Sequence, residues 1–124
     1  MHTQTIAQAP VNRRGGQESY LLLSKGQFGA QNLAINWVEG VPGSEQRAHL
    51  HEGQEQVYVI VRGRGLMRVG DEEQPVEAGT MILVPPLTLH SIRNASDEPL
   101  IYVSATAPPF DDALIAADFK YVPQ

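Results

Sequence analysis

Short apolar runs separated by glycine and proline dominate the sequence. Turn signals such as Gly15-Gly16, Pro42-Gly43 and Gly70-Asp71 recur along the chain. The runs between them are rich in β-branched, aromatic and aliphatic residues, which favour strands. The expected strands are residues 20–23, 33–38, 57–61, 66–69, 81–84, 90–92 and 100–103. Several short strands with turns between them predict an all-β sandwich or barrel.

Three segments carry more specific expectations. Residues 57–61 are apolar at every position, which predicts a strand buried on both faces. Trp37 is the single tryptophan and is expected in the core, with lining the pocket as the alternative. Asp111 and Asp112 are plausible N-caps for a short helix over residues 113–119, so only the tail is expected to be helical.

The chain has the length of one domain, with 124 residues. We expect a polar arm over residues 1–16, loose or adding an edge strand, a barrel over 17–107, and a tail over 108–124 in the same domain. Nine basic against fourteen acidic residues give a net charge of −5, which argues against a nucleic-acid partner. No run is long enough for a membrane helix, and no signal peptide is evident at the N-terminus, so we expect a cytoplasmic protein without a membrane partner.

The histidines are the candidate metal ligands of this chain. The chain has no cysteine, so any metal must be held by nitrogen and oxygen ligands. On a strand, the spacing of His49 and His51 places both imidazoles on one face, with Arg47 beside them and Leu50 opposite. His90 follows Pro85-Pro86 and could join them, whereas His2 lies near the terminus and is expected to have no role.

The residues around these histidines resemble the two motifs of the cupin superfamily, in its small single-domain bacterial form. The first motif corresponds to Gly43, the pair His49 and His51, and Gly63; the second corresponds to Gly79, Pro85, His90 and Asn94. The resemblance covers residues 43–94 and implies a double-stranded β-helix, or jelly-roll-like, barrel.

Two positions depart from the cupin pattern. Leu87 stands where the second motif has glycine, so we expect Pro85-Pro86 to make that turn without a positive φ. The acidic ligand of the first motif is also displaced. Counting back from Gly63 places Gln56 there, whereas counting forward from His51 places Glu55 there, and neighbouring strand residues face opposite sides. We favour Gln56, because the register to Gly63 is set within a regular strand.

The resemblance implies one divalent transition metal (Mn, Fe, Ni, Zn or Cu) held by His49, His51, Gln56 and His90, as in the similar pectin-degradation cupins. It further implies an enzyme acting on a small sugar-derived or keto acid by Lewis-acid lyase or isomerase chemistry. The alternatives are a dioxygenase, favoured by Glu55 as ligand, and a non-catalytic binding or sensing module.

Two side chains are candidates for contact with the substrate. Arg47 could bind a substrate carboxylate or be an arginine at the rim, and Tyr58 could donate a proton or simply fill the barrel. Small cupins of this kind also commonly form homodimers, which implies a second copy as a partner. Phe110 and Phe119 are expected to dock on the barrel or across that interface.

Overall fold

A computed structural model of the chain describes residues 1–110. The helix expected over residues 113–119, and Phe119 with it, lie outside the described residues. Strands make up almost all of the regular structure, with two short 3-10 helices near the N-terminus. The elements are η1 (Ile6–Gln8), β1 (Val11–Arg14), β2 (Gln17–Leu23), η2 (Gln27–Gly29), β3 (Ala34–Gly40), β4 (Glu55–Arg62), β5 (Arg64–Val69), β6 (Glu72–Glu77), β7 (Met81–Val84), β8 (His90–Arg93) and β9 (Leu100–Ala107).

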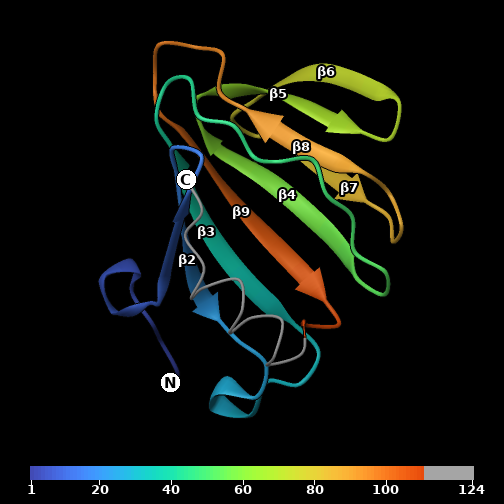
Figure 1. Ribbon diagram of the computed structural model, residues 1–124. Coiled ribbons are helices and arrows are strands. Elements are labelled where there is room, and N and C mark those ends of the chain that lie inside the picture. Colours follow the sequence, from blue (N-terminus) through green and yellow to red (C-terminus); the bar gives the residue numbers. More distant parts are fainter. Residues whose placement is uncertain (111–124) are drawn as a thin grey trace.

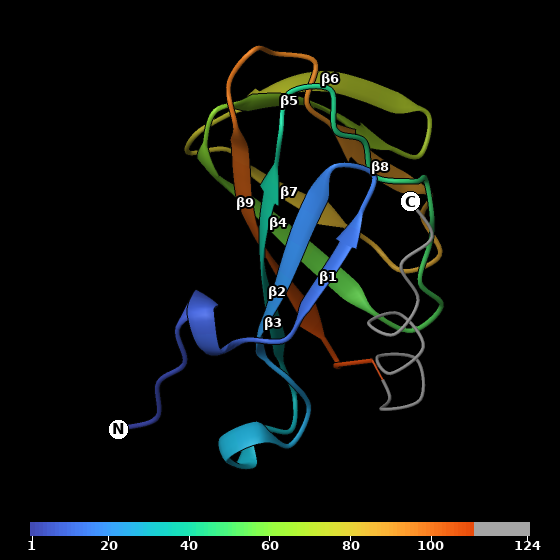
Figure 2. The same ribbon diagram turned by 60° about the vertical axis from the view of Figure 1, so that its left-hand side comes forward.

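The strands form two antiparallel sheets, which confirms the predicted all-β barrel. The larger sheet has the order β1-β2-β3-β9-β4-β7, and the smaller one has the order β6-β5-β8. The smaller sheet closes one end of the molecule, at the top of Figure 1, while β2, β3, β9 and β4 run toward the other end. In the view turned by 60°, the hairpin of β1 and β2 lies in front of the other strands of the larger sheet (Figure 2).

All seven expected strands are present, together with two strands outside those ranges, β1 and β6. β1 extends the polar arm as an edge strand, the second of the two outcomes expected for residues 1–16. β6 was missed because its sequence, EEQPVE, is polar; only Val76 turns inward, into the core. Asp71 makes the turn as expected, but the acidic residues after it already belong to β6. None of the described helices is long and apolar enough to cross a membrane.

The hydrophobic core fills the space between the two sheets. The larger sheet contributes Val38, Tyr58, Ile60 and Tyr102 from β3, β4 and β9. From the smaller sheet come Met67, Val76 and Ile92. The Tyr58 and Tyr102 rings stack with centroids 5.0 Å apart, which joins β4 to β9 through the centre of the molecule. Burial of these side chains is the main term that stabilises the barrel.

Two expectations about burial are wrong. The outer face of β4 is not covered, since Val59 is 40% exposed and Val61 is 45% exposed. Trp37 is neither in the core nor in a pocket: it lies half-buried on the outer face of β3, where its indole Nε1–H donates to Glu39 Oε2 at 2.8 Å. Apolar residues at consecutive strand positions identified a strand, but they did not distinguish two buried faces from one buried face and one apolar surface.

The inner face of the larger sheet changes from apolar to polar along its length. One cross-strand row joins Val38, Tyr102 and Ile60 across β3, β9 and β4. Two residues further along, the row joins Asn36, Ser104 and Tyr58. The next row contains Thr106 and Gln56, both buried. Because an apolar interior would exclude these amides and hydroxyls, the polar end of the sheet is where a site is expected.

Leu87 makes the turn before β8 in an unexpected way. The φ of Leu87 is 59°, so the leucine itself adopts the left-handed conformation. The expectation of a turn without a positive φ is therefore wrong. The Leu87 N–H donates to the carbonyl oxygen of His51 at 2.8 Å, while the leucine side chain is exposed. The turn therefore keeps the geometry of a glycine turn, and the backbone hydrogen bond to His51 holds a branched residue in it.

Replacing Leu87 with glycine should relieve this backbone strain. A left-handed leucine costs roughly 1–2 kcal/mol, and the greater freedom of glycine in the unfolded chain offsets roughly 0.5–1 kcal/mol of that. We therefore expect Leu87→Gly to raise the free energy of unfolding by up to about 1 kcal/mol, measured by urea denaturation. Leu33→Gly, at an exposed position without a positive φ, is the control and should be destabilising. A Leu87→Gly protein as destabilised as this control would contradict the account.

Candidate metal centre

The three histidines singled out in the sequence meet at one end of the barrel. His90 begins β8, and His49 lies opposite it in an isolated antiparallel bridge. Their backbones exchange two hydrogen bonds, His49 N to His90 O at 3.0 Å and His90 N to His49 O at 2.9 Å. The His51 ring lies 4.8 Å from that of His49 and 5.3 Å from that of His90, between centroids. The structure thus gathers all three side chains around one point.

The backbone around His49 and His51 is not a regular strand, and the expected alternation of faces fails there. Arg47 lines the cavity beside the histidines as expected, but so do Gln46 and Leu50. The bridges of Glu45 to Arg93 and of His49 to His90 tie this segment to β8, as does the hydrogen bond that Gln46 N donates to Ile92 O at 3.0 Å. The bridge fixes the backbone of His49, and the Leu87 N–H fixes that of His51 by donating to its carbonyl oxygen. The HxH spacing was therefore a sound guide for a reason other than strand alternation.

The imidazole rings present unprotonated nitrogens to the shared point. His49 Nδ1 lies 2.7 Å from the carbonyl oxygen of Arg47, and His90 Nδ1 lies 2.9 Å from that of Thr88. Because a carbonyl can only accept, these contacts require a proton on Nδ1, so in the neutral ring the lone pair is on Nε2. His51 Nε2 and His90 Nε2 are buried and have no hydrogen-bond partner.

Burial keeps two of the rings neutral. Burial, reinforced by the nearby His49 and His90, lowers the pKa of His51 to about 4, although Gln56 opposes the shift. The pKa of His90 is also lowered, first by burial and then by His49, although the Thr88 carbonyl opposes the shift. These histidines are therefore unprotonated near pH 7, the form in which imidazole binds a metal.

The register of β4 separates the two candidates for a fourth ligand. Gln56 is buried on the inner face and lines the cavity, whereas Glu55 is exposed. The Gln56 amide is oriented by Thr106 of β9, whose hydroxyl accepts a hydrogen bond from Gln56 Nε2 at 3.0 Å. Gln56 Oε1 is then buried without a partner, like the two imidazole nitrogens.

These groups fit a metal ion. The ligand atoms of His49, His51 and His90 all lie within 4.8 Å of one another. Buried lone pairs without donors are costly, and a cation among them would satisfy several at once. Imidazole nitrogens with an amide oxygen suit Mn, Fe, Ni, Zn or Cu better than Ca or Mg. The three histidines could therefore hold one transition metal, and the Gln56 amide oxygen is available beside them.

A cavity of about 360 Å³ opens beside the histidines. Gln46 and Tyr58 lie in its wall, where Gln46 Nε2 donates to the Tyr58 hydroxyl at 3.1 Å. Burial raises the pKa of Tyr58 to about 12, so its hydroxyl stays protonated. Arg47 is exposed at the wall. Among the residues that the structure describes, no aspartate or glutamate lines this cavity, so its fixed charge is positive.

Two residues of the site, Thr106 and Gln46, were not foreseen, and a third, Phe110, was expected on the barrel but not at the site. Thr106 and Gln46 act through side-chain hydrogen bonds to Gln56 and Tyr58, and no local sequence signal marks such partners. Phe110 docks on the barrel, one of its two expected positions, and its ring centroid lies 4.7 Å from that of His51. Its side chain also lines the cavity.

Comparison with known proteins identifies the protein family of this chain. Residues 36–106 match the family model described as the cupin domain. An uncharacterized protein of Methanocaldococcus jannaschii, MJ1618, is 38% identical over 68 residues, 55% of this chain and 54% of that protein, so the match spans about half the length of that relative. An oxalate-binding protein of Thermotoga maritima is 29% identical over 96 residues, 75% of this chain and 79% of that one.

Solved structures agree on the fold. An RmlC-like cupin from Shewanella frigidimarina superimposes with a TM-score of 0.75 at 21% identity, covering 91% of this chain and 96% of that one. At this identity the likeness concerns the arrangement of strands alone.

Thr106 offers a test of how the Gln56 amide is oriented. Thr106→Val keeps the shape of the side chain but removes the acceptor for Gln56 Nε2, so the amide oxygen should lose its fixed direction. Partners that orient metal ligands typically contribute about 10–100-fold in affinity. We expect Thr106→Val to weaken Mn²⁺ or Zn²⁺ binding by about tenfold, measured by competition with a chelator. Thr80→Val, in the loop before β7, is the matched control, and equal affinity in the two variants would contradict this role.

Proposed function

Since the chain belongs to the cupin family, we propose that it is a metal-dependent enzyme acting on a small sugar-derived or keto acid by Lewis-acid lyase or isomerase chemistry. The metal would be held by His49, His51, His90 and the Gln56 amide oxygen. The observation that carries this proposal is the kind of ligand atom available: the nitrogens of three histidines lie within 4.8 Å of one another, the unpartnered Gln56 Oε1 belongs to a residue that lines the same cavity, and no carboxylate is among the described residues that line it.

A neutral ligand set has a direct chemical consequence. Carboxylate ligands reduce the net charge of a divalent site, whereas imidazoles and an amide leave it at +2. A divalent ion bound there would polarise a carbonyl or enediol oxygen. The rest of the cavity reinforces the preference for anions, because Arg47 adds positive charge and can bind a carboxylate in a bidentate way.

Tyr58 is the proposed proton donor of the site. Its hydroxyl is protonated near pH 7, because burial raises its pKa to about 12. The Gln46 side chain holds that hydroxyl in the cavity wall. A phenol in this position can donate a hydrogen bond to a substrate oxygen as negative charge develops on it. Arg47 then orients the acid, and Phe110 shields the reacting end from water on the side of His51.

A binding module without turnover is the second candidate. It is favoured by the relative from Thermotoga maritima, whose name describes oxalate binding rather than a reaction. Both candidates require a small anion beside the metal, so binding alone does not separate them. A dioxygenase is a weaker alternative, because Glu55, the ligand that would favour it, is exposed on the opposite face of β4.

Exchange of protons beside a carbonyl separates these functions. The metal-loaded protein should accelerate deuterium incorporation into the methyl group of pyruvate under argon, followed by NMR, because polarising the carbonyl promotes enolisation. His90→Ala should lose the acceleration while keeping its circular dichroism spectrum. Pyruvate binding without exchange would favour the binding module, and consumption of pyruvate in air but not under argon would favour the dioxygenase.

Changing the charge of the ligand set tests the preference for anions. Gln56→Glu should retain the metal but bind oxalate about tenfold more weakly, because the site falls from +2 to +1; this change corresponds to roughly 1.4 kcal/mol. Glu55→Gln, on the exposed face of the same strand, is the matched control and should bind oxalate as the wild type does. Calorimetry on the Mn²⁺-loaded proteins measures both. Unchanged oxalate affinity in Gln56→Glu would argue against Gln56 as a ligand.

We also propose that the protein forms a homodimer through the outer face of β4 and β7. Val59, Val61, Met81 and Leu83 are 40–60% exposed there, and β7 is an edge strand. Val59 pairs with Met81 across the two strands, so the apolar side chains adjoin. A second copy brings an identical uncharged surface, which lets two chains of the same net charge, −5, associate.

A charge placed on this face should separate the copies. We expect Val59→Glu to change the mass measured by light scattering from that of a dimer to that of a monomer, because a carboxylate would be buried without a partner. Val41→Glu, at an exposed valine in the loop after β3, should leave the dimer intact. A wild-type protein that is monomeric at micromolar concentration would rule the interface out.

A further inference from the structure

The wall of the cavity formed by β1, β2 and β3 is polar, although it belongs to the inner face of the larger sheet. Asn12 and Arg14 of β1, Gln17 and Ser19 of β2, and Asn36 of β3 all line the cavity. The register pairs Asn12 with Ser19 and Arg14 with Gln17, so the side chains adjoin across the hairpin. Polar residues at inward positions are unfavourable unless they have partners, so a wall of this composition indicates a ligand.

Two atoms of this wall are buried without partners. Asn12 and Gln17 are each only 7% exposed. Gln17 Oε1 accepts a hydrogen bond from the Tyr102 hydroxyl at 3.2 Å, which leaves Nε2 as a donor with no acceptor. Asn12 Oδ1 is an acceptor with no donor. By contrast, Ser19 Oγ accepts a hydrogen bond from Asn36 Nδ2 at 3.0 Å, so polar groups of this wall can be satisfied within the fold.

The two unsatisfied atoms have complementary roles. A hydroxyl group both donates and accepts hydrogen bonds, so the hydroxyls of one ligand can satisfy the acceptor Asn12 Oδ1 and the donor Gln17 Nε2. Water could do the same, but the cavity of about 360 Å³ is far larger than one water molecule and lies in the size range of small-molecule sites. A two-carbon anion at the histidines would leave this wall without a partner.

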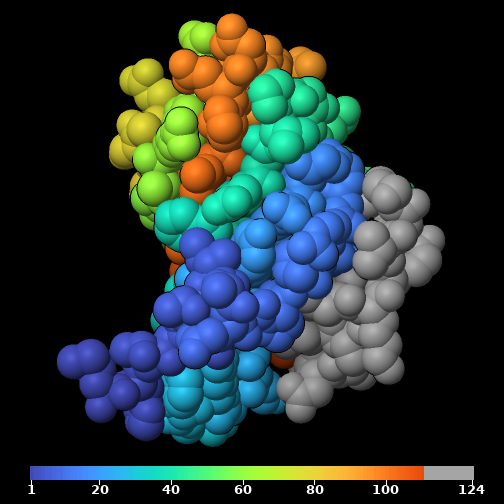
Figure 3. Space-filling model, turned by 90° about the vertical axis from the view of Figure 1, so that its left-hand side faces the viewer, coloured from blue at the N-terminus to red at the C-terminus, as the bar shows by residue number. Residues whose placement is uncertain are grey.

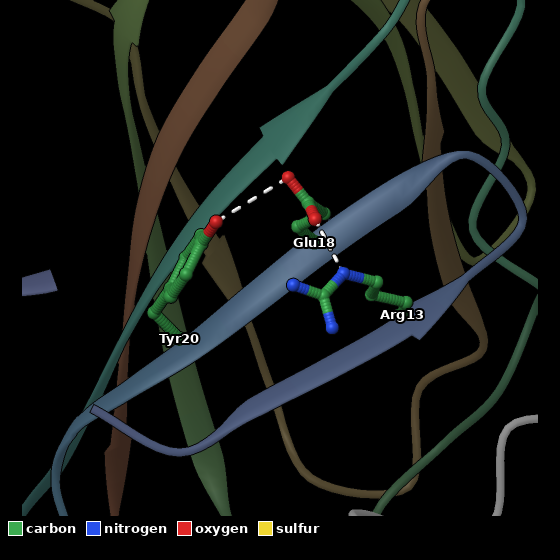
Figure 4. Close-up of polar contacts among 3 residues, drawn as sticks. All are labelled: Arg13, Glu18 and Tyr20. Atoms are coloured by element: carbon green, nitrogen blue, oxygen red, sulfur yellow. Dashed lines mark hydrogen bonds and ion pairs between the residues drawn. The ribbon is translucent and has the colours of Figure 1, made fainter. Parts of the chain in front are cut away.

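The outer face of the hairpin holds the wall in position. Arg13, between Asn12 and Arg14, points outward and forms an ion pair with Glu18 of β2. Tyr20 donates to the other oxygen of the same carboxylate at 3.3 Å (Figure 4). N-terminal residues cover much of one face of the molecule (Figure 3). The edge strand β1 is therefore tied to β2 on its outer side while it presents Asn12 inward.

We propose that Asn12 and Gln17 form a hydroxyl-binding subsite, and that the substrate is a polyhydroxylated carboxylic acid whose acid end lies at the histidines. This inference rests on the proposed function, because it takes the metal centre as the site of the acid end. It narrows the substrate class from small acids in general to sugar-derived acids that carry a hydroxyl beyond the reacting atoms. It also gives the N-terminal hairpin a role in specificity.

Gluconate and glycolate test this inference, since both offer the same α-hydroxycarboxylate to a metal and only gluconate carries further hydroxyls. We expect the Mn²⁺-loaded wild type to bind gluconate at least tenfold more tightly than glycolate, measured by calorimetry. Asn12→Leu should remove most of this difference and change glycolate affinity by less than twofold. Asn32→Leu, at an exposed position before β3, is the control and should behave as the wild type does.

Gln17→Met gives the second test. Because Gln17→Met also removes the acceptor of the Tyr102 hydroxyl, both proteins compared carry Tyr102→Phe. We expect Gln17→Met in the Tyr102→Phe background to lose gluconate affinity about tenfold relative to Tyr102→Phe alone. Equal binding of the two acids by the wild type, or equal weakening of both acids in the variants, would overturn the subsite. Glycolate affinity that is the same with and without Mn²⁺ would instead overturn the proposed function.

Discussion

The backbone bridge between His49 and His90 is the interaction on which the site depends. Two reciprocal hydrogen bonds join a segment without regular strand structure to the start of β8, and they bring the ring of His90 within 4.2 Å of that of His49, between centroids. The Leu87 N–H adds a third link, to the carbonyl of His51. Because these bonds use only backbone atoms, the imidazole Nε2 atoms of His51 and His90 remain available, and burial keeps both rings neutral.

Apolar burial elsewhere in the barrel offsets the free-energy cost of these unpartnered polar atoms. The inner face of the larger sheet is divided: the row of Val38, Tyr102 and Ile60 belongs to the hydrophobic core, while the next two rows carry the polar side chains of Asn36, Ser104, Thr106 and Gln56. The apolar half supplies burial that stabilises the fold, so the polar half can keep the Gln56 amide oxygen without a partner, facing the cavity that the histidines also line. The two ends of these strands thus serve stability and the site respectively.

Much of this could be predicted from the sequence, because motif glycines, short apolar runs and the HxH pair are local signals. Gly43, Gly63 and Gly79 all have positive φ, as turn glycines should. The features that the sequence did not predict depend on contacts between residues distant in sequence. The strand β6 has one inward apolar residue, Trp37 lies on an outer face that its own sequence does not define, and Thr106 is recognisable as a partner of Gln56 only in three dimensions.

Metal content tests the central claim most directly. The wild-type protein, Gln56→Ala and Glu55→Ala would each be purified without added metal, and the bound transition metal measured by mass spectrometry. The account predicts about one metal ion per chain in the wild type and in Glu55→Ala, and a marked loss in Gln56→Ala. Metal retained by Gln56→Ala but lost from Glu55→Ala would contradict the ligand set, and a wild type that binds no metal even after reconstitution would contradict the proposed mechanism.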